Sequence, residues 1–292
     1  MIGLGTMGGP IARHLARAGH ALTIYARSPA RLARWRARHG DLVVADAPSP
    51  AAAAQGAEVV ITCVGNDDDL ADVVLSPTGV FTTLAPGSLF IDHTTVSARI
   101  ARQIAVEARD KHILCVDAPM TGAQAGAEAG RLTLMCGGRA DAIEAARPVM
   151  EAYARLIVHV GKAGTGQATK MVNQIALAGV TAGVAEALRL AQAEHLDLDK
   201  VFEAISHGAA QSWQMDNRWH TMARDEFDDF GFAIDWMRKD LGLALEEGRG
   251  LGLSLPMTAM IDQLYADVQA LGGGRQDTSA LIRRLPRRGA RK

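Results

Sequence analysis

The sequence predicts an α/β fold for the N-terminal half, with a doubly wound and mainly parallel sheet, followed by an all-α half joined through a long helix. Two observations support this fold class. Up to about residue 160, short apolar runs rich in Val, Ile and Leu alternate with segments of helical period, as in a parallel sheet that helices cover on both faces. From residue 164 on, the chain is rich in Ala, Leu, Met and Gln, and residues 164–195 contain no strand-like run.

The expected elements follow this alternation along the chain. Strands are expected at residues 21–25, 42–44, 59–64, 89–92, 112–117, 133–136 and 156–160. Helices are expected at residues 10–18, 29–38, 97–110, 140–154 and 164–195. The change of pattern near residues 161–163 predicts two domains, residues 1–162 and residues 163–292.

Composition excludes several classes of protein. A chain of 292 residues is long enough for two domains of ordinary size. Its 31 basic and 32 acidic residues leave a net charge of −1, so no overall field attracts nucleic acid. The N-terminus lacks a basic segment followed by an apolar stretch, and the apolar residues 175–185 are short and flanked by polar side chains. We therefore expect neither a secretory signal nor a membrane span.

The three cysteines, Cys63, Cys115 and Cys136, each lie in an apolar run and lack the spacing of metal ligands. Reduced thiols that pack as small apolar groups in a cytoplasmic protein explain them best. The histidines are scattered as well, so no metal site is expected.

A glycine-rich turn opens the chain. Residues 3–8 read GLGTMG, which fits G-x-G-x-x-G, and a helical segment follows directly. The first glycine permits a tight turn, the second lets the backbone approach a pyrophosphate, and the third allows close packing of helix and strand. The pattern alone is weak, but the strand at 21–25 follows where a Rossmann-type βαβ unit requires one. The residues expected to contact a dinucleotide here are Gly3, Gly5, Thr6, Met7 and Gly8.

The end of the second strand bears on which dinucleotide binds. An NAD enzyme normally offers a carboxylate here to the ribose hydroxyls, but residues 25–28 read YARS and contain no acid. The guanidinium of Arg27 and the hydroxyl of Ser28, with Arg31 nearby, suit a 2′-phosphate, so NADP is favoured over NAD. The alternative is that these arginines are solvated residues at the start of a helix.

The first strand is unusually short. Only Met1 and Ile2 precede the glycine-rich turn, whereas the central first strand of such a sheet usually has about five to six residues. A stub would leave the middle of the sheet poorly paired. We therefore expect that the natural product starts earlier than this chain.

Four blocks now give a family resemblance. They read GLGTMGGPIARHL near the start, DAPMTGAQAGAEAG at 117–130, GTGQATKMVNQ at 164–174 and KDLGLALE at 239–246. In this order they resemble the β-hydroxyacid dehydrogenase family, which includes 3-hydroxyisobutyrate dehydrogenase, tartronate semialdehyde reductase and glyoxylate reductases. The match covers nearly the whole chain and implies a helical C-terminal domain like that of 6-phosphogluconate dehydrogenase.

The resemblance implies that Lys170 is the catalytic lysine. The residues themselves are compatible with this role, because Asn173 and Gln174 follow at i+3 and i+4 on the same helical face. An ammonium beside two amides can hydrogen-bond a carbonyl oxygen and protonate it as hydride arrives. Asn173 is expected to take part in catalysis, and both amides in substrate binding. A surface lysine on an amphipathic helix is the alternative.

Thr121, Gly122 and Ala123 correspond to the family's Ser-Gly-Gly segment. The resemblance implies that their backbone amides and a hydroxyl hold the substrate carboxylate. Two residues depart from the family pattern: Thr121 adds a methyl group, and Ala123 restricts the backbone. We expect these departures to change the preferred substrate size without removing anion binding.

The resemblance also implies further cofactor contacts. Lys239 matches a late lysine near the nicotinamide, with Asp240 helping to place it. Val64, Gly65, Asp69 and Thr95 are the other expected contacts, and Gly65 replaces a more usual proline. Simple turn chemistry is the alternative explanation for these loop residues.

Together these features predict hydride transfer between NADP(H) and a small β-hydroxy or α-hydroxy acid or semialdehyde. The dinucleotide supplies the redox chemistry, and the protein supplies orientation and one proton-transfer group. The resemblance implies a homodimer or homotetramer. Two alternatives remain: an imine reductase-like enzyme, against which Lys170 argues, and a dinucleotide-binding module without catalysis. Residues alone do not give the substrate.

Overall fold

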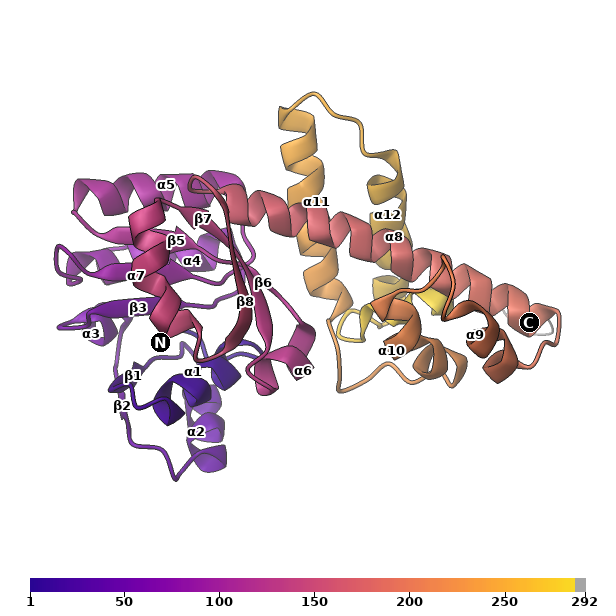
Figure 1. The fold of residues 1–292 in the computed structure, drawn as a ribbon, viewed down its shortest axis with the longest axis horizontal. Coiled ribbons are helices and arrows are strands. Elements are labelled where there is room, and N and C mark those ends of the chain that lie inside the picture. Colours follow the sequence, from indigo (N-terminus) through magenta and orange to yellow (C-terminus); the bar gives the residue numbers. More distant parts are fainter. Residues whose placement is uncertain (287–292) are drawn as a thin grey trace. The chain divides into compact units, whose positions relative to one another are not determined.

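The computed structural model describes residues 1–286 and divides the chain into two compact units, Met1–Lys170 and Met171–Lys292 (Figure 1). The first is an α/β unit and the second is helical, as the sequence predicts. The boundary between the two units, after Lys170, falls inside the long helix α8 (Thr165–Ala193). The boundary predicted from the sequence, at 162/163, lies just before that helix.

The sheet of the α/β unit is mainly parallel. Its larger part has the strand order β3-β4-β5-β7-β6, with β8 also paired to β7, and β1 pairs with β2. All pairs are parallel except those of β7 with β5 and β6. The strands are β1 Leu22–Ile24, β2 Val44–Asp46, β3 Val59–Thr62, β4 Leu89–Asp92, β5 Leu114–Asp117, β6 Met120–Thr121, β7 Leu132–Gly138 and β8 Ala154–Gly161.

The first three residues connect the two parts of the sheet, with Ile2 at the centre. Ile2 forms parallel bridges to Tyr25 on one side and to Thr62 on the other. Its amide donates to the Ile61 carbonyl at 2.8 Å, and the amide of Gly3 donates to the Tyr25 carbonyl at 2.9 Å. Ile2 is fully buried, so this short segment occupies the central position that the first strand of such a sheet requires.

Helices cover both faces of the sheet, and the alternation of strand side chains assigns each face. Leu89 and Ile91 of β4 face the core that includes α1, α2 and α7, while Phe90 faces the core of α3, α4 and α5. The helices are α1 Gly8–Arg17, α2 Pro29–Arg38, α3 Pro50–Ala54, α4 Asp67–Leu75, α5 Ala98–Asp110, α6 Ala123–Glu128 and α7 Ala140–Met150, with a short 3-10 turn at Val80–Thr82.

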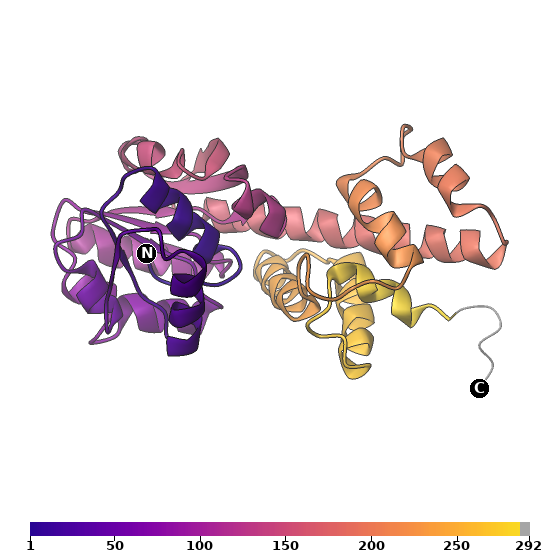
Figure 2. The ribbon, with the colours of Figure 1, turned by 90° about the horizontal axis from the view of Figure 1, so that it is seen from below.

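In the helical unit, α8 is followed by α9 Leu198–Ile205, α10 Trp213–Ala223, α11 Ile234–Gly250, α12 Pro256–Ala270 and a 3-10 turn at Thr278–Arg284 (Figure 2). Its core gathers Leu188 of α8, Trp219 of α10, Leu241 of α11 and Tyr265 of α12, all buried. Among residues 1–286, α8 alone is long and apolar enough to cross a membrane. Since part of α8 lies in this core, the core helix of a folded domain explains that composition.

Candidate active site

The glycine-rich turn lies at the carboxyl edge of the sheet, where dinucleotides bind in such folds. Gly3 has φ +95°, and a Cβ there would lie 2.1 Å from the Cys63 carbonyl oxygen. A Cβ on Gly8 would lie 2.1 Å from the Gly3 carbonyl oxygen. At Gly5, in contrast, a Cβ would meet only Nη1 of Arg31, at 3.9 Å. The middle glycine therefore faces open space, which fits the approach of a pyrophosphate.

The end of β1 carries basic rather than acidic side chains. Arg27 is exposed, and its Nη1 donates to Oδ1 of Asp69 at 2.6 Å. Asp69 lies in the first turn of α4, a helix that the sequence-based prediction missed, and its amide donates to the capping Asn66 side chain. Ser28 precedes α2 in an extended conformation. Two expected cofactor residues, Arg27 and Asp69, thus form an ion pair.

The ends of β3 and β4 are joined by a buried cluster around Asp92. The hydroxyl of Thr62 donates to Oδ1 of Asp92 at 2.7 Å, and the amide and hydroxyl of Thr94 donate to the same oxygen at 3.0 and 2.6 Å. The Thr94 hydroxyl oxygen also accepts from the amide of Val64 at 3.1 Å. Val64 and Thr95 are predicted cofactor contacts, so this cluster fixes the backbone of the two loop segments that contain them. Sequence reasoning missed both Asp92 and Thr94.

Burial raises the pKa of Asp92 to about 7, against the donated hydrogen bonds that favour its charged form. Its Oδ2 atom is buried, with no hydrogen-bond partner among the described residues. The carboxyl therefore changes charge near neutral pH rather than near its ordinary pKa of 3.8.

Replacing Asp92 by Asn should remove a pH dependence of stability. Between about pH 4 and about pH 7 the folded protein holds a proton here that the unfolded chain has lost, because the folded pKa is the higher one. The contribution of Asp92 to the free energy of unfolding thus falls as the pH rises through this window. Relative to wild type, the free energy of unfolding of the variant should rise by on the order of 4 kcal/mol across the window.

Urea denaturation of both proteins at several pH values measures this difference. Asn keeps an oxygen that can accept from Thr62 and Thr94. Burial also raises the pKa of Asp117 to about 6 and lowers that of His93 to about 4, and both groups are present in the two proteins, so only the coulombic coupling of Asp117 to Asp92, the smallest cause of the Asp92 shift, differs between the profiles. Profiles that stay parallel from pH 4 to pH 8 would contradict the prediction.

Asp117, at the end of β5, anchors the start of α8. Its Oδ1 accepts from the amide of Gly164 at 2.8 Å, and its Oδ2 accepts from the amide of Gln167 at 3.1 Å. These amides belong to the N-terminal turn of the helix, where a carboxylate satisfies donors that the helix leaves unpaired. In the sequence analysis, Asp117 is the first residue of the block at 117–130, but no role was predicted for it.

Lys170 lies in the second turn of α8 and is buried, with 8% of its surface exposed. The preceding turn of α8 is fixed by Gln167, which is fully buried. The Gln167 side chain accepts from the amide of Val96 at 3.1 Å and donates to the carbonyl of Thr94 at 2.7 Å. The catalytic lysine predicted from sequence is therefore anchored at the carboxyl ends of β4 and β5, the edge that carries the glycine-rich turn.

In the helical unit, the other predicted polar residues form a chain of contacts. Asn173 donates to the side-chain oxygen of Gln174 at 2.8 Å, and Gln174 donates to Oδ2 of Asp240 at 2.6 Å. The ammonium of Lys239 lies 3.1 Å from Oδ1 of Asp240. Asp240 is thus the buried centre that orients both Gln174 and Lys239.

The predicted carboxylate-binding segment forms the turn between β6 and α6. Gly122 has φ +130°, and Ala123 has φ +54°, so two successive residues adopt the left-handed half of conformational space. The C-terminal end of α6 is held by α1, because Arg13 donates to the Glu128 carbonyl and Nε2 of His14 lies 3.1 Å from the Ala127 carbonyl oxygen. A Cβ on Gly130 would lie 3.0 Å from the His14 ring.

Replacing Ala123 by Gly should stabilise the protein, because alanine is strained at positive φ. The expected gain is about 0.5–1 kcal/mol, the strain relieved less the greater freedom of glycine in the unfolded chain. Ala127→Gly, in the same helix, is the matched control and should destabilise by about 1 kcal/mol or more. Urea denaturation measures both. Equal losses in the two variants would show that position 123 is not strained.

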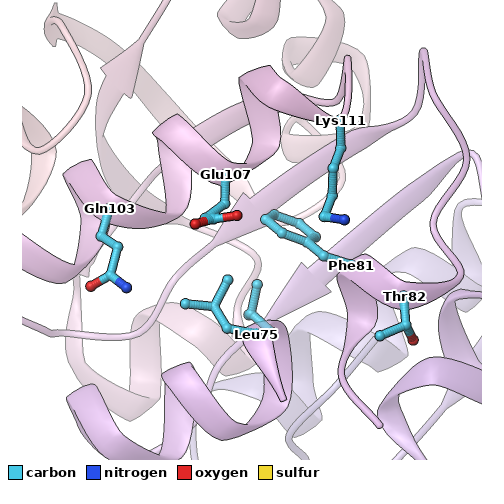
Figure 3. Close-up of a pocket in the computed structure, with 7 residues that line it drawn as sticks. Leu75, Phe81, Thr82, Gln103, Glu107 and Lys111 are labelled. Carbon is cyan, nitrogen blue, oxygen red and sulfur yellow. The ribbon is translucent and has the colours of Figure 1, made fainter. Parts of the chain in front are cut away.

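The pocket drawn in Figure 3, of about 300 Å³, lies elsewhere. Leu75 is at the C-terminal end of α4, and Glu107 and Lys111 are at the C-terminal end of α5 and just beyond it. Helices that connect parallel strands run opposite to them, so this pocket lies at the edge of the sheet remote from the glycine-rich turn. Among residues 1–286, no group of three or more His, Cys, Asp or Glu side chains could hold a metal ion.

Comparison with known families agrees with this geometry. Residues 1–161 match a family described as the NAD binding domain of 6-phosphogluconate dehydrogenase. Residues 164–285 match a family described as NAD-binding of NADP-dependent 3-hydroxyisobutyrate dehydrogenase.

Individual proteins align over almost the full length. An uncharacterized oxidoreductase of Shewanella frigidimarina is 51% identical over 97% of this chain and 96% of its own. The NAD-dependent L-serine dehydrogenase of Pseudomonas aeruginosa is 34% identical over 96% of this chain and 95% of its own. The 3-hydroxyisobutyrate dehydrogenase of Mycobacterium tuberculosis, in a structure with L-serine, superposes with a TM-score of 0.85 at 32% identity, over 97% of both chains. The chain therefore belongs to the β-hydroxyacid dehydrogenase family of NAD(P)-binding oxidoreductases.

Proposed function

We propose that this protein transfers hydride between a nicotinamide dinucleotide and a small β-hydroxy acid, with Lys170 as the general acid and base. One observation carries the proposal. Lys170 is buried, and the helical turn before it is tied to the ends of β4 and β5, at the edge of the sheet where the glycine-rich turn also lies. A buried amine held at the dinucleotide edge is what proton transfer to a reacting carbonyl needs.

The residues of the chain divide the work as follows. In the reduction direction the Lys170 ammonium donates a hydrogen bond to the carbonyl oxygen and passes it a proton, and in the oxidation direction the neutral amine accepts the proton of the alcohol. When bound, the dinucleotide supplies or takes up the hydride. Asn173 and Gln174 follow in the next turn of α8, and we propose that their amides bind the substrate, with Gln174 oriented by Asp240.

We propose that the substrate carries a carboxylate, held by the turn at Thr121–Ala123. The positive φ values of Gly122 and Ala123 shape a concave backbone of the kind that binds anions, and the Thr121 hydroxyl adds a donor. A relative named for L-serine and a related structure with L-serine support a short β-hydroxy acid. The methyl group of Thr121 and the side chain of Ala123 reduce the room beside the carboxylate, which favours small substrates.

We propose NADP as the cofactor in preference to NAD. Residues 25–28 at the end of β1 include Arg27 and Ser28 and no acidic residue of their own, although Arg27 pairs with Asp69 of α4, and Nη1 of Arg31 lies 3.9 Å from a Cβ built on Gly5. Guanidinium groups at this point suit a 2′-phosphate.

We also propose that the protein forms a homodimer or homotetramer through the exposed face of α8. Val172, Val180 and Leu190 are exposed on this helix, and nothing lies within 4 Å of a Cβ built on Gly179 or Gly183. An apolar stripe with small residues suits close packing of a second copy. Light scattering during gel filtration should give the mass of a dimer or a tetramer, and Val180→Glu should lower it towards that of the monomer.

Initial rates with a panel of substrates test the proposed activity. The panel holds L-serine, 3-hydroxyisobutyrate, tartronate semialdehyde, glyoxylate, succinic semialdehyde and a cyclic imine, each with NADP(H) and with NAD(H). Turnover of a short β-hydroxy acid, with a higher kcat/KM for NADP, is the expected result. Reduction of the imine alone would indicate an imine reductase, and dinucleotide binding without turnover of any compound would indicate a binding module. Either of these outcomes would overturn the proposal.

A further inference from the structure

The Gln167 side chain bridges two segments that carry different predicted functions. It bonds to the backbone at both neighbours of Thr95, accepting from Val96 and donating to Thr94. Thr95 is a predicted dinucleotide contact, and Lys170 follows Gln167 three residues later along α8. Because Gln167 is fully buried, both of its bonds form where water does not compete.

The contacts extend on both sides of this bridge. The Thr94 hydroxyl accepts from the amide of Val64, so a hydrogen bond links the segments that follow β3 and β4. On the other side, the amide of Gln167 donates to the carboxylate of Asp117 at the end of β5. A continuous path of hydrogen bonds therefore runs from two predicted dinucleotide-contacting segments to the turn that precedes Lys170.

We propose that Gln167 is a positioning residue that couples the dinucleotide-contacting segment to Lys170, so that binding of the dinucleotide orders the helical turn on which the lysine stands. This proposal depends on the proposed function in one respect, namely that Thr95 contacts the dinucleotide and Lys170 transfers the proton. A glutamine is suited to this task because its amide places N–H donors and an oxygen acceptor at the reach that the two partners require. Methionine has a similar length but offers neither bond, and an ionised glutamate lacks the donor.

Hydrogen exchange with and without NADP⁺ tests the coupling without any turnover. In the wild type, NADP⁺ should slow amide exchange in both residues 94–96 and residues 164–170. In Gln167→Met, NADP⁺ should slow exchange at 94–96 alone. Gln214→Met, at another buried glutamine in α10, is the matched control and should behave as the wild type does. Equal protection of residues 164–170 in Gln167→Met and in the wild type would overturn the proposal.

Kinetics give the second readout. Gln167→Met should lower kcat by about 10- to 100-fold, the effect of displacing a reacting group by roughly 1 Å, while the Kd for NADP⁺ changes by only a few-fold. In a Lys170→Met background the same substitution should cost nothing further, because there is no amine left to misplace. A merely structural role would lower the unfolding midpoint and leave kcat unchanged, which would contradict the proposal.

Gln167→Glu provides a rescue that does not depend on the fate of the methionine variant. A protonated glutamic acid has the shape of glutamine and restores a donor to the Thr94 carbonyl, and burial will raise its pKa towards neutrality. The kcat of this variant relative to wild type should therefore rise as the pH falls from 8 to 6. A ratio independent of pH would argue against the bridge. If Lys170→Met instead keeps full activity, the proposed function fails, whereas the exchange experiment still decides the coupling.

Discussion

Replacing Lys170 by Met is expected to lower kcat by about 10²- to 10⁴-fold, the usual contribution of a general acid or base. The Kd for NADP⁺ should change by only a few-fold, because the glycine-rich turn and the β1 end are untouched. Stopped-flow or steady-state assays measure the rate, and fluorescence titration measures the affinity. Lys162→Met, at an exposed lysine just before α8, is the matched control and should keep full activity.

A smaller side chain sharpens this test. Lys170→Ala leaves a space where the buried amine was, so added ethylamine should restore part of the rate, more at high pH in the oxidation direction, where the neutral amine accepts the proton. Wild-type turnover in both variants would remove Lys170 from the chemistry. A lost rate that no amine restores would leave its role as a proton carrier unsupported.

Gly5→Ala and Gly8→Ala should affect different properties: the first should weaken dinucleotide binding, and the second should destabilise the fold. Gly5→Ala should leave stability unchanged, because its Cβ meets only the far end of Arg31, at 3.9 Å. It should raise the Kd for NADP⁺ by about 100-fold, since the methyl group occupies the space through which a pyrophosphate reaches the backbone.

Gly8→Ala should instead lower the free energy of unfolding by about 3 kcal/mol or more, because its Cβ would lie 2.1 Å from the Gly3 carbonyl oxygen and 2.8 Å from Cε of Met1. Thermal unfolding and dinucleotide titration of both variants separate the two effects. Unchanged affinity in Gly5→Ala would place the dinucleotide away from the turn. A stable Gly8→Ala would show that the turn can open without loss.

Elements with strong local signals could be predicted from the sequence. The helix at Pro29–Arg38 has the predicted bounds, because Pro29 fixes its first turn and basic residues end it. The strand at Leu89–Asp92 was also correct, as an apolar run between turn residues. For β2 the prediction was shifted, because exposed Val43 precedes the strand and Val44–Asp46 forms the pairs with β1. The predicted helix 140–154 ends at Met150, since residues from Ala154 on pair with β7.

The missed elements are short, and tertiary contacts hold them. The helices α3 and α6 have five and six residues, too few for a periodic pattern. The strand β6 has two residues and is defined by its pairing with β7 alone. For α4 a signal was present, because Asn66 precedes three successive acidic residues, which is typical of a helix start.

The residues that position the candidate site could not be predicted in the same way. Lys170, Asn173 and Lys239 were predicted from motifs, which describe chemistry at fixed spacings, and their roles remain proposals. Asp92, Thr94 and Gln167 act through bonds between segments about 30 to 70 residues apart, and only the fold brings these together. A buried Asp at a strand end looks the same in sequence whether it caps a helix or joins two strands.

The contact between α1 and α6 has a consequence for protein engineering. Arg13 and His14 hold the end of the segment that is proposed to bind the carboxylate, and Gly130 leaves room for the imidazole. A transplant of residues 120–130 from a relative with different substrate selectivity therefore has to include positions 13 and 14, so the portable piece is discontinuous along the chain. Directed evolution that randomises only the loop would leave those two positions unchanged, and with them the contacts that hold the end of α6.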